Sequence, residues 1–256
     1  MRKEFPDGTW AFRSGSAGRR QWWRRGRRMN TAQGGSRTAL PSRQAGGSRL
    51  ELRMLWLSSP NQRAAALPAV WLVATDHRPA TLTERSALRR GLARTVLAAQ
   101  FNLEPDAVRI EHEPGGRPLI AAPFGSGLQI SLATRAGLVA LALAHGPVGV
   151  DVEQVDPASQ PPLAALHPAE QVALLALPPP ARPLAFAQLW SAKEAYVKAL
   201  GTGFRRAPDS FEVKLAGLDG FSVQDPERPG AQAEGVGRII KNGGHGTMAA
   251  AFIQLA

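Results

Sequence analysis

The chain has 256 residues, of which 44% are hydrophobic, and it carries 31 Lys and Arg against 20 Asp and Glu, a formal net charge of +11. This length can build one large domain or two small ones, and the hydrophobic content is ordinary for a folded soluble protein. The absence of Cys excludes disulfide scaffolds, thiol nucleophiles and Cys-ligated zinc. No apolar run approaches the roughly 18 residues that a membrane span needs, so we expect a soluble, cytoplasmic protein without a membrane partner.

The first 65 residues hold all of the excess positive charge. They contain 14 Lys and Arg against 3 Asp and Glu, whereas residues 66–256 contain 17 of each. The segment is rich in Gly, Ser, Arg and Gln and has no sustained hydrophobic period, so it cannot bury enough apolar surface to offset the entropy of ordering its backbone. We predict that residues 1–65 are a disordered basic extension, in which only 50–57 could form a short element. The alternative, which we disfavour, is an arm that touches nucleic acid or anionic membrane through its arginines, with Trp22 and Trp23 stacking or inserting among them.

The next part of the chain, residues 66–147, has the pattern of a mixed lobe. A strand is predicted over 68–76, with Trp71 and Val73 on one face. An amphipathic helix is predicted over 83–100, because apolar residues recur there at helical spacing, and Thr83 is its expected N-cap. The other predicted strands of this half span 106–113, 113–120 after a glycine-rich turn, 128–133 and 137–144.

Residues 148–256 repeat this mixture of helix and strand. A β-branched, alternating strand is predicted over 148–155, helices over 167–177 and 181–201 with Gly201 at the C-cap, and strands over 210–217, 220–225 and 246–255. The sequence therefore predicts an α+β fold of two pseudo-symmetric lobes, residues 66–147 and 148–256, each with a helix packed on an antiparallel sheet. Two lobes in one chain also favour a monomer.

The strand over 148–155 places two carboxylates on one face. Residues two apart in a strand point the same way, so Asp151 and Glu153 share a side while Val150 and Val152 face the core. Neighbouring carboxylates repel unless a cation lies between them, and Mg²⁺ favours one or two carboxylates together with water and substrate phosphates. The alternative is an exposed face with two solvated acids.

The helix over 181–201 carries Glu194 and Lys198 at positions i and i+4, the favourable order for a salt bridge on a helix surface. Such a bridge explains the pair without any function. For Trp190 and Tyr196 on the same helix, core packing is the preferred interpretation.

The strand GVDVE (149–153) followed by the helix WSAKEAYVK (190–198) resembles the signature of the Sfp-type 4'-phosphopantetheinyl transferase superfamily. The family pattern is a G-[IV]-D-[IV]-E strand and a W-x-x-KE-A-x-x-K helix, and both are met without substitution. Weaker agreement extends over residues 66–256 and includes the turn at 116–118, HPAE at 167–170 and GTGF at 201–204. Residues 1–65 have no counterpart in the pattern.

The resemblance implies a holo-[acyl-carrier-protein] synthase type of enzyme. It would move the 4'-phosphopantetheine group of coenzyme A to a serine of an apo acyl or peptidyl carrier protein, in a Mg²⁺-dependent reaction. The resemblance implies that Asp151, Glu153 and Glu194 hold Mg²⁺ against the pyrophosphate of coenzyme A, and that Glu194 also accepts the serine proton. A metal that neutralises charge developing on phosphate oxygens agrees with this chemistry.

Basic residues complete the implied site. Lys198 would act with Glu194 in catalysis by balancing charge at the pyrophosphate, and Lys193 would flank it. Arg85 and Arg117 match positions where the family places basic contacts to the phosphates of coenzyme A. For these two arginines, a solvated surface position is the alternative.

One departure from the family concerns a phosphate-binding His that usually precedes the Gly-Leu strand. Here Thr134 stands at that position, and its hydroxyl can donate one hydrogen bond but brings no charge. Arg135 could supply the charge instead. We expect either weaker binding of the cofactor or a different contact to the phosphate, and a catalytically impaired relative that still binds coenzyme A is therefore an alternative function.

Overall fold

The structure is a computed structural model that describes residues 3–4, 10–11, 56–77, 79–122, 127–158, 160–202, 205–231, 233–241 and 246–256. The chain divides into two compact units, residues 1–50 and 51–256. In the first unit, β1 (Lys3–Glu4) pairs antiparallel with β2 (Trp10–Ala11). Most of the predicted basic extension, including Trp22 and Trp23 of the alternative nucleic-acid arm, lies outside the described residues.

The first sheet of the second unit has the strand order β3-β4-β8-β7. Its strands are β3 (Trp56–Leu57), β4 (Ala69–Ala74), β7 (Gln129–Arg135) and β8 (Leu138–Ala144). The three longer strands pair antiparallel, whereas β3 runs parallel to β4. Strand β3 lies within the segment 50–57, where a short element was expected, and it extends the sheet at its edge.

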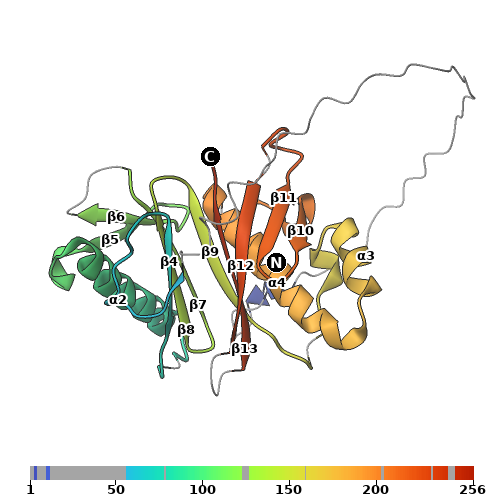
Figure 1. Ribbon diagram of the computed structural model, residues 1–256, viewed down its shortest axis with the longest axis horizontal. Helices are drawn as coiled ribbons and strands as arrows, with labels where there is room; N and C mark the ends of the chain where they lie inside the picture. The colour runs from blue at the N-terminus through green and yellow to red at the C-terminus, as the bar shows by residue number, and fades with distance from the viewer. Residues whose placement is uncertain are drawn as a thin grey trace, which may run out of the picture. The chain divides into compact units, whose positions relative to one another are not determined.

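Helix α2 (Leu82–Phe101) covers one face of this sheet (Figure 1). Trp71 and Val73 share that face, as predicted, and form a buried cluster with Val96 and Leu97 of the helix.

The prediction of Thr83 as the N-cap of this helix is wrong. The cap is Thr81, whose hydroxyl accepts from the backbone N–H of Glu84, while the Glu84 carboxylate accepts from the N–H groups of Ala80 and Thr81. Only Thr81 has a glutamate three residues later, which is the requirement of a capping box.

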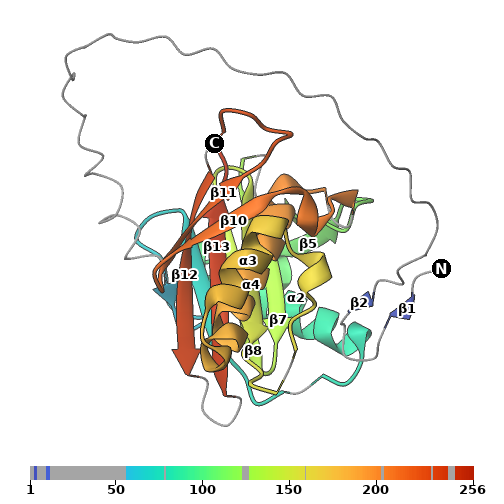
Figure 2. The same ribbon diagram turned by 90° about the vertical axis from the view of Figure 1, so that its right-hand side faces the viewer.

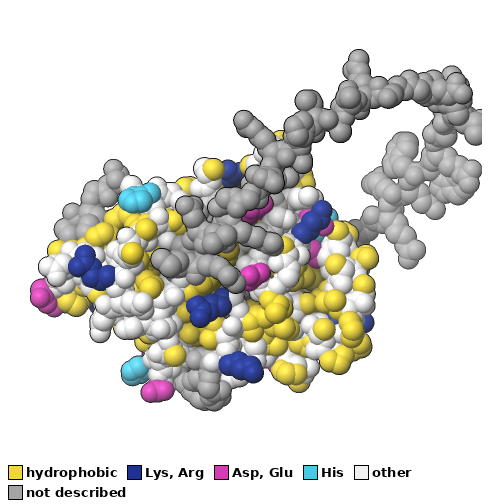
Figure 3. Space-filling model, viewed as in Figure 1, with side chains coloured by type: hydrophobic (Ala, Val, Ile, Leu, Met, Phe, Trp, Pro, Cys, Tyr) yellow, Lys and Arg dark blue, Asp and Glu magenta, His cyan; other side chains and the backbone are white. Residues whose placement is uncertain are grey.

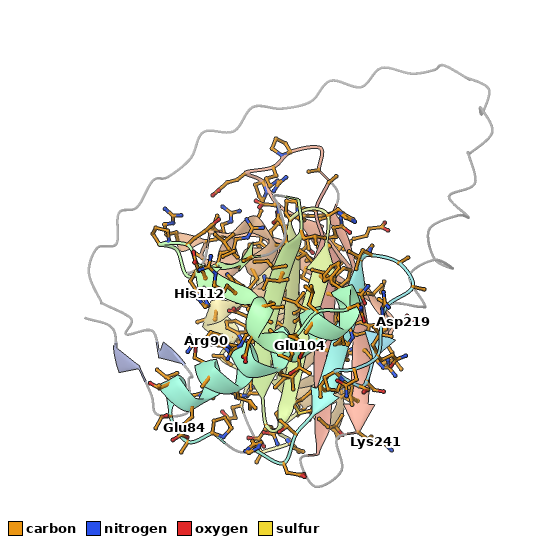
Figure 4. All side chains as sticks on the ribbon, turned by 90° about the vertical axis from the view of Figure 1, so that its left-hand side faces the viewer. Glu84, Arg90, Glu104, His112, Asp219 and Lys241 are labelled. Carbon is orange, nitrogen blue, oxygen red and sulfur yellow. The ribbon has the colours of Figure 1, made fainter. Side chains whose placement is uncertain are left out.

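A hairpin follows α2. A short 3-10 helix (Pro105–Ala107) leads into β5 (Arg109–His112), which pairs antiparallel with β6 (Pro118–Ala122). The turn between them contains Gly116 at a φ of +85°, a conformation that a glycine adopts without strain. Figure 4 shows the hairpin beside α2, with His112 near Arg90 of the helix.

The second sheet has the strand order β10-β11-β12-β13-β9 and is antiparallel throughout. Its strands are β9 (Val148–Gln154), β10 (Glu212–Ala216), β11 (Gly220–Gln224), β12 (Ala233–Lys241) and β13 (Thr247–Gln254). Strand β12 was not predicted, because Gly235 and Gly237 interrupt its apolar alternation. Gly235 is needed there, since a Cβ at this position would lie 2.1 Å from the ring of Phe221.

Helices α3 (Pro168–Ala176) and α4 (Arg182–Leu200) cover the outer face of the second sheet (Figure 2). Short 3-10 helices span Leu163–Ala165, Pro179–Ala181 and Pro208–Ser210. Helix α4 ends at Gly201 with a φ of 68°, as predicted. None of the helices in the described ranges is long and apolar enough to cross a bilayer.

The two sheets face each other across a third buried cluster. Val70 and Leu72 of β4 lie in it together with Val150 and Val152 of β9 and Phe252 of β13. The layers therefore run helix, sheet, sheet, helix, and each sheet carries a long helix on its outer face (Figure 1). The predicted α+β class with antiparallel sheets is confirmed.

Candidate active site

Strand β9 and helix α4 are in direct backbone contact at Gly149. A Cβ at this position would lie 1.7 Å from the carbonyl oxygen of Ala195 and 2.8 Å from the amide nitrogen of Ala199. Only glycine permits this approach. Because side chains alternate along a strand, Asp151 and Glu153 share the face of Gly149 that meets α4. Their neighbours Val150 and Val152 lie in the cluster between the sheets, as the sequence pattern predicts.

Lys198 of α4 reaches the carboxylate of Asp151. Its ammonium lies 2.7 Å from Asp151 Oδ1 and also donates to the carbonyl oxygens of Val150 at 3.1 Å and Leu132 at 3.3 Å. A lysine ammonium has three N–H donors, and these three acceptors use all of them. Lys198 therefore pairs with a strand residue rather than with Glu194 on its own helix, so the simple helix-surface salt bridge is not the arrangement found.

The pKa values of Asp151, Glu153 and Glu194 are all raised where β9 meets α4. Burial, with the charges of Asp151 and Glu194, raises the pKa of Glu153 to about 8. Burial and the charge of Asp151 raise the pKa of Glu194, and burial raises that of Asp151 against the opposing effect of Lys198. Arg135 lies 3.4 Å from Glu153 Oε2 and partly balances it. Neighbouring carboxylates raise the pKa of one another because each negative charge disfavours a second one beside it.

The donor chemistry of this site fits a hard divalent cation. Asp151 is 7% exposed, and its Oδ2 is buried without a hydrogen-bond partner. A buried, unpartnered carboxylate oxygen requires an explanation, and an ion is one. Within the described ranges, however, no three Asp, Glu or His side chains are gathered as a ready-made metal group. The carboxylates provide suitable oxygen ligands that have not converged on one point.

One basic residue of α2, Arg89, interacts electrostatically with Asp151 of this acidic site. Burial and the charges of Arg85 and Arg90 lower the pKa of Arg89, and the charge of Asp151 opposes them. Arg85, which the sequence singled out, has its Nε buried without a partner. Arg89 is an addition that the sequence reasoning missed. The available signal was its spacing of four residues from Arg85, which places both on one face of the helix.

The end of β7 carries Thr134, which stands where the family usually has a His, and Arg135 beside it. The hydroxyl of Thr134 is buried without a hydrogen-bond partner. Arg135, the next residue, contacts Glu153 as described above. Buried, unsatisfied polar atoms thus occur on β7, β9 and α2 around one place, which is the pattern of a site for a polar ligand.

Arg117 comes to the C-terminal end of α4. It hydrogen-bonds to Gln129, and its Nη1 lies 3.1 Å from where a Cβ of Gly201 would stand. The turn before β6 and the end of α4 are therefore neighbours. Arg117 therefore lies beside Gly201, which follows Lys198 by three positions in the sequence.

Lys193 does not belong to this site, which corrects the expectation that it flanks a bound pyrophosphate. Its side chain is 1% exposed and lies 2.6 Å from Glu170 Oε1 of α3. The ammonium also donates to the carbonyl oxygens of Pro208 at 2.7 Å and Phe211 at 2.8 Å. Lys193 holds α4 to α3 and to the segment before β10, where a ligand of the acidic site has no access.

A cavity of about 280 Å³ lies beside the other flank of α2, and none of the predicted site residues lines it. Its charged lining is Arg90, Arg94, Asp106, Arg109 and Glu111. On the face seen in Figure 3, the Lys and Arg side chains of the described residues are scattered rather than gathered into a basic patch.

Comparison with known proteins agrees with the placement of the strand and helix motifs. Residues 147–241, which hold β9 and α4, match the model of the 4'-phosphopantetheinyl transferase superfamily. The predicted family resemblance is confirmed. The 4'-phosphopantetheinyl transferase HetI of Nostoc sp. is 29% identical over 140 residues, 53% of this chain and 59% of the relative. The 4'-phosphopantetheinyl transferase Sfp of Bacillus subtilis is 29% identical over 144 residues, 56% of this chain and 63% of the relative.

The chain spans about three fifths of the length of these superfamily relatives. A solved structure of holo-[acyl-carrier-protein] synthase from Thermotoga maritima covers 43% of this chain and 64% of its own, at 18% identity and a TM-score of 0.29. That score is too low to carry a structural argument.

Proposed function

We propose that the protein transfers the 4'-phosphopantetheine group of coenzyme A to a serine hydroxyl of an apo acyl or peptidyl carrier protein. The serine oxygen forms a bond to phosphorus, the pyrophosphate bond of coenzyme A breaks, and 3',5'-ADP leaves. The observation that carries the proposal is the contact of β9 with α4. It brings the Asp151 and Glu153 strand motif and the Glu194 helix motif into one electrostatic site, in the region that matches the superfamily.

In this proposal Asp151, Glu153 and Glu194 are the residues that would hold Mg²⁺. When bound, Mg²⁺ supplies neutralisation of the charge on the pyrophosphate and orients the leaving group. The buried, unpartnered Oδ2 of Asp151 supports a ligand at this point. The raised pKa of Glu194 makes its carboxylate a stronger base than a solvated one, which suits a residue that accepts the serine proton.

Positive groups around the acidic site would bind the phosphates of coenzyme A. Arg89 on α2 interacts with the charge of Asp151, Arg85 lies close enough to Arg89 to lower its pKa, and Arg117 lies at the end of α4. An arginine can give two parallel hydrogen bonds to one phosphate. Thr134 takes the place of the usual His and offers its buried hydroxyl to a phosphate oxygen, while Arg135 beside it supplies the charge.

The direct test is carrier loading followed by mass spectrometry. The protein is incubated with coenzyme A, MgCl₂ and several purified apo carrier proteins, and we expect one carrier to gain the mass of one phosphopantetheine group. The matched control is the same carrier with its acceptor serine replaced by alanine, which must stay unmodified. EDTA in place of MgCl₂ should abolish the gain.

A second arm tests the role of Glu194. The Glu194→Gln variant keeps the shape of the side chain but can neither accept a proton nor bind a cation as a carboxylate. We expect at least a hundredfold loss of transfer, in the range of general acid–base contributions, with coenzyme A binding retained in calorimetry. Full activity in this variant would remove the proposed role. The proposed function would be refuted if this protein left every carrier unmodified while a reference transferase modified the same carriers in a parallel reaction.

A further inference from the structure

Arg135 ends strand β7 and reaches strand β9 of the other sheet. The hydroxyl of Ser131 on β7 accepts from the backbone N–H of Val150 on β9 at 3.0 Å, so the two strands lie side by side at this point. Further along both strands, Arg135 Nε lies 3.4 Å from Glu153 Oε2. This ion pair connects the strand that carries Thr134 with the strand that carries the acidic motif.

Glu153 is a carboxylate that needs a positive charge beside it. Burial and the charges of Asp151 and Glu194 raise its pKa, whereas the charges of Arg135 and Lys198 lower it. Of the cations that the structure describes, Arg135 is the one in an ion pair with Glu153. The two side chains are 31% and 21% exposed, so water screens their attraction less than it would on an open surface. Arg135 is therefore the counter-ion of Glu153.

The proposed function gives Arg135 a second partner. Thr134 stands where the family usually has a phosphate-binding His, and its buried hydroxyl brings no charge, so Arg135 beside it is the residue left to supply charge to a phosphate. A guanidinium paired with a carboxylate has its charge offset, and it attracts a phosphate less strongly than an unpaired one. The two partners therefore compete for one side chain.

We infer that Arg135 exchanges partners: it neutralises Glu153 while the acidic site holds no metal, and it turns to a phosphate oxygen of coenzyme A once Glu153 is neutralised otherwise. This inference rests on the proposed function for the identity of the cofactor and the cation. Neutralisation of Glu153 and binding of coenzyme A are then coupled through this one side chain, and such a coupling acts equally in both directions. The charge of the missing His is available only when Glu153 no longer needs it.

The exchange can be tested without a metal, because Glu153→Gln removes the charge that holds Arg135. Calorimetry in EDTA gives the Kd for coenzyme A of the unmodified protein, Arg135→Gln, Glu153→Gln and the double variant. We expect Arg135→Gln to change the Kd less than about threefold in the unmodified background, and to raise it about tenfold or more in the Glu153→Gln background. Independent sites would give the same factor in both backgrounds.

A second arm leaves Glu153 unchanged and adds MgCl₂. At saturating MgCl₂ we expect Arg135→Gln to raise the Kd for coenzyme A about tenfold or more, against less than about threefold in EDTA. The matched control is Arg89→Gln. Its charge acts on Asp151, but Arg89 forms no ion pair with Glu153 within the described ranges, so it should change the Kd by the same factor in both conditions.

The inference would be overturned if Arg135→Gln changed the Kd by equal factors with and without MgCl₂, because that result is the general effect of one positive charge. If Glu153→Gln folds poorly, the MgCl₂ arm alone decides. An unmodified protein that binds no coenzyme A in either condition would refute the proposed function together with the exchange. Binding of coenzyme A with equal factors would refute the exchange alone, so the two failures are distinguishable.

Discussion

Gly149 sets the distance between the strand and the helix that build the acidic site, so its replacement by alanine is a severe perturbation. The added Cβ would lie 1.7 Å from the carbonyl oxygen of Ala195, whereas ordinary van der Waals contacts begin near 3.4 Å. The obstructing atoms belong to helix backbone and cannot rotate away. Helix α4 must therefore move away from β9, or the strand must bend.

The expected cost follows from this overlap. Overpacking of a core costs about 1–3 kcal/mol, and a clash with backbone lies at or above the upper end. A loss of about 3 kcal/mol lowers the Tm of a domain of roughly 200 residues by about 6–12 °C. In the unmodified protein the Lys198 ammonium lies 2.7 Å from Asp151. The displacement of the helix moves the two groups out of hydrogen-bond reach. Transfer activity should fall together with the Tm.

Thermal unfolding followed by circular dichroism measures this prediction. The matched control is Gly91→Ala in α2, where a Cβ would meet nothing within 4 Å. That substitution should raise stability by about 0.5–1 kcal/mol, because alanine is the better helix former. A Gly149→Ala protein with the Tm of the unmodified protein would show that β9 and α4 are not in the contact described, and would refute the reasoning.

Two further predictions concern charged residues. Replacing Lys193 with Met leaves the buried carboxylate of Glu170 without its cationic partner, so urea unfolding should show a loss of about 3–5 kcal/mol in the free energy of unfolding. Adding Glu170→Gln should recover part of this loss. A Lys193→Met variant of normal stability that binds coenzyme A poorly would show that Lys193 does belong to the site. Arg89→Gln should raise the Kd for coenzyme A, measured by calorimetry, about tenfold, which corresponds to roughly 1.4 kcal/mol of binding free energy. The control Arg94→Gln, which changes a residue that lines the cavity on the other flank of α2, should change the Kd less than twofold. Equal effects of the two variants would show that Arg89 does not face the phosphates.

Local patterns predicted most of the elements because their physical causes are local. The alternation in 148–155 identified β9 and correctly assigned Val150 and Val152 to the core, and Gly201 marked the end of α4. The pattern failed where a neighbour in space determines the residue. Gly235 breaks the alternation of β12 because the ring of Phe221 occupies the space of its side chain, and nothing near it in the sequence indicates this.

The two lysines of α4 show the same limit within the candidate site. Five residues turn about 140° round a helix, so Lys193 and Lys198 cannot face one ligand, yet the family motif contains both. The sequence does not say which of the two faces the acidic strand. The structure assigns Lys193 to the buried pair with Glu170 and Lys198 to Asp151.

The sequence by itself determined most of the elements and the carboxylate residues, because periodicity and motif spacing are properties of short segments. Only the tertiary structure decided how β9 approaches α4 and how β7 meets β9. It also decided that Arg89 interacts with the acidic site and that Lys193 pairs with Glu170 outside it. Those outcomes depend on contacts between residues far apart in the sequence, from 19 positions for Ser131 with Val150 to 66 positions for Leu132 with Lys198. Packing across such separations is set by the whole core and not by any local pattern.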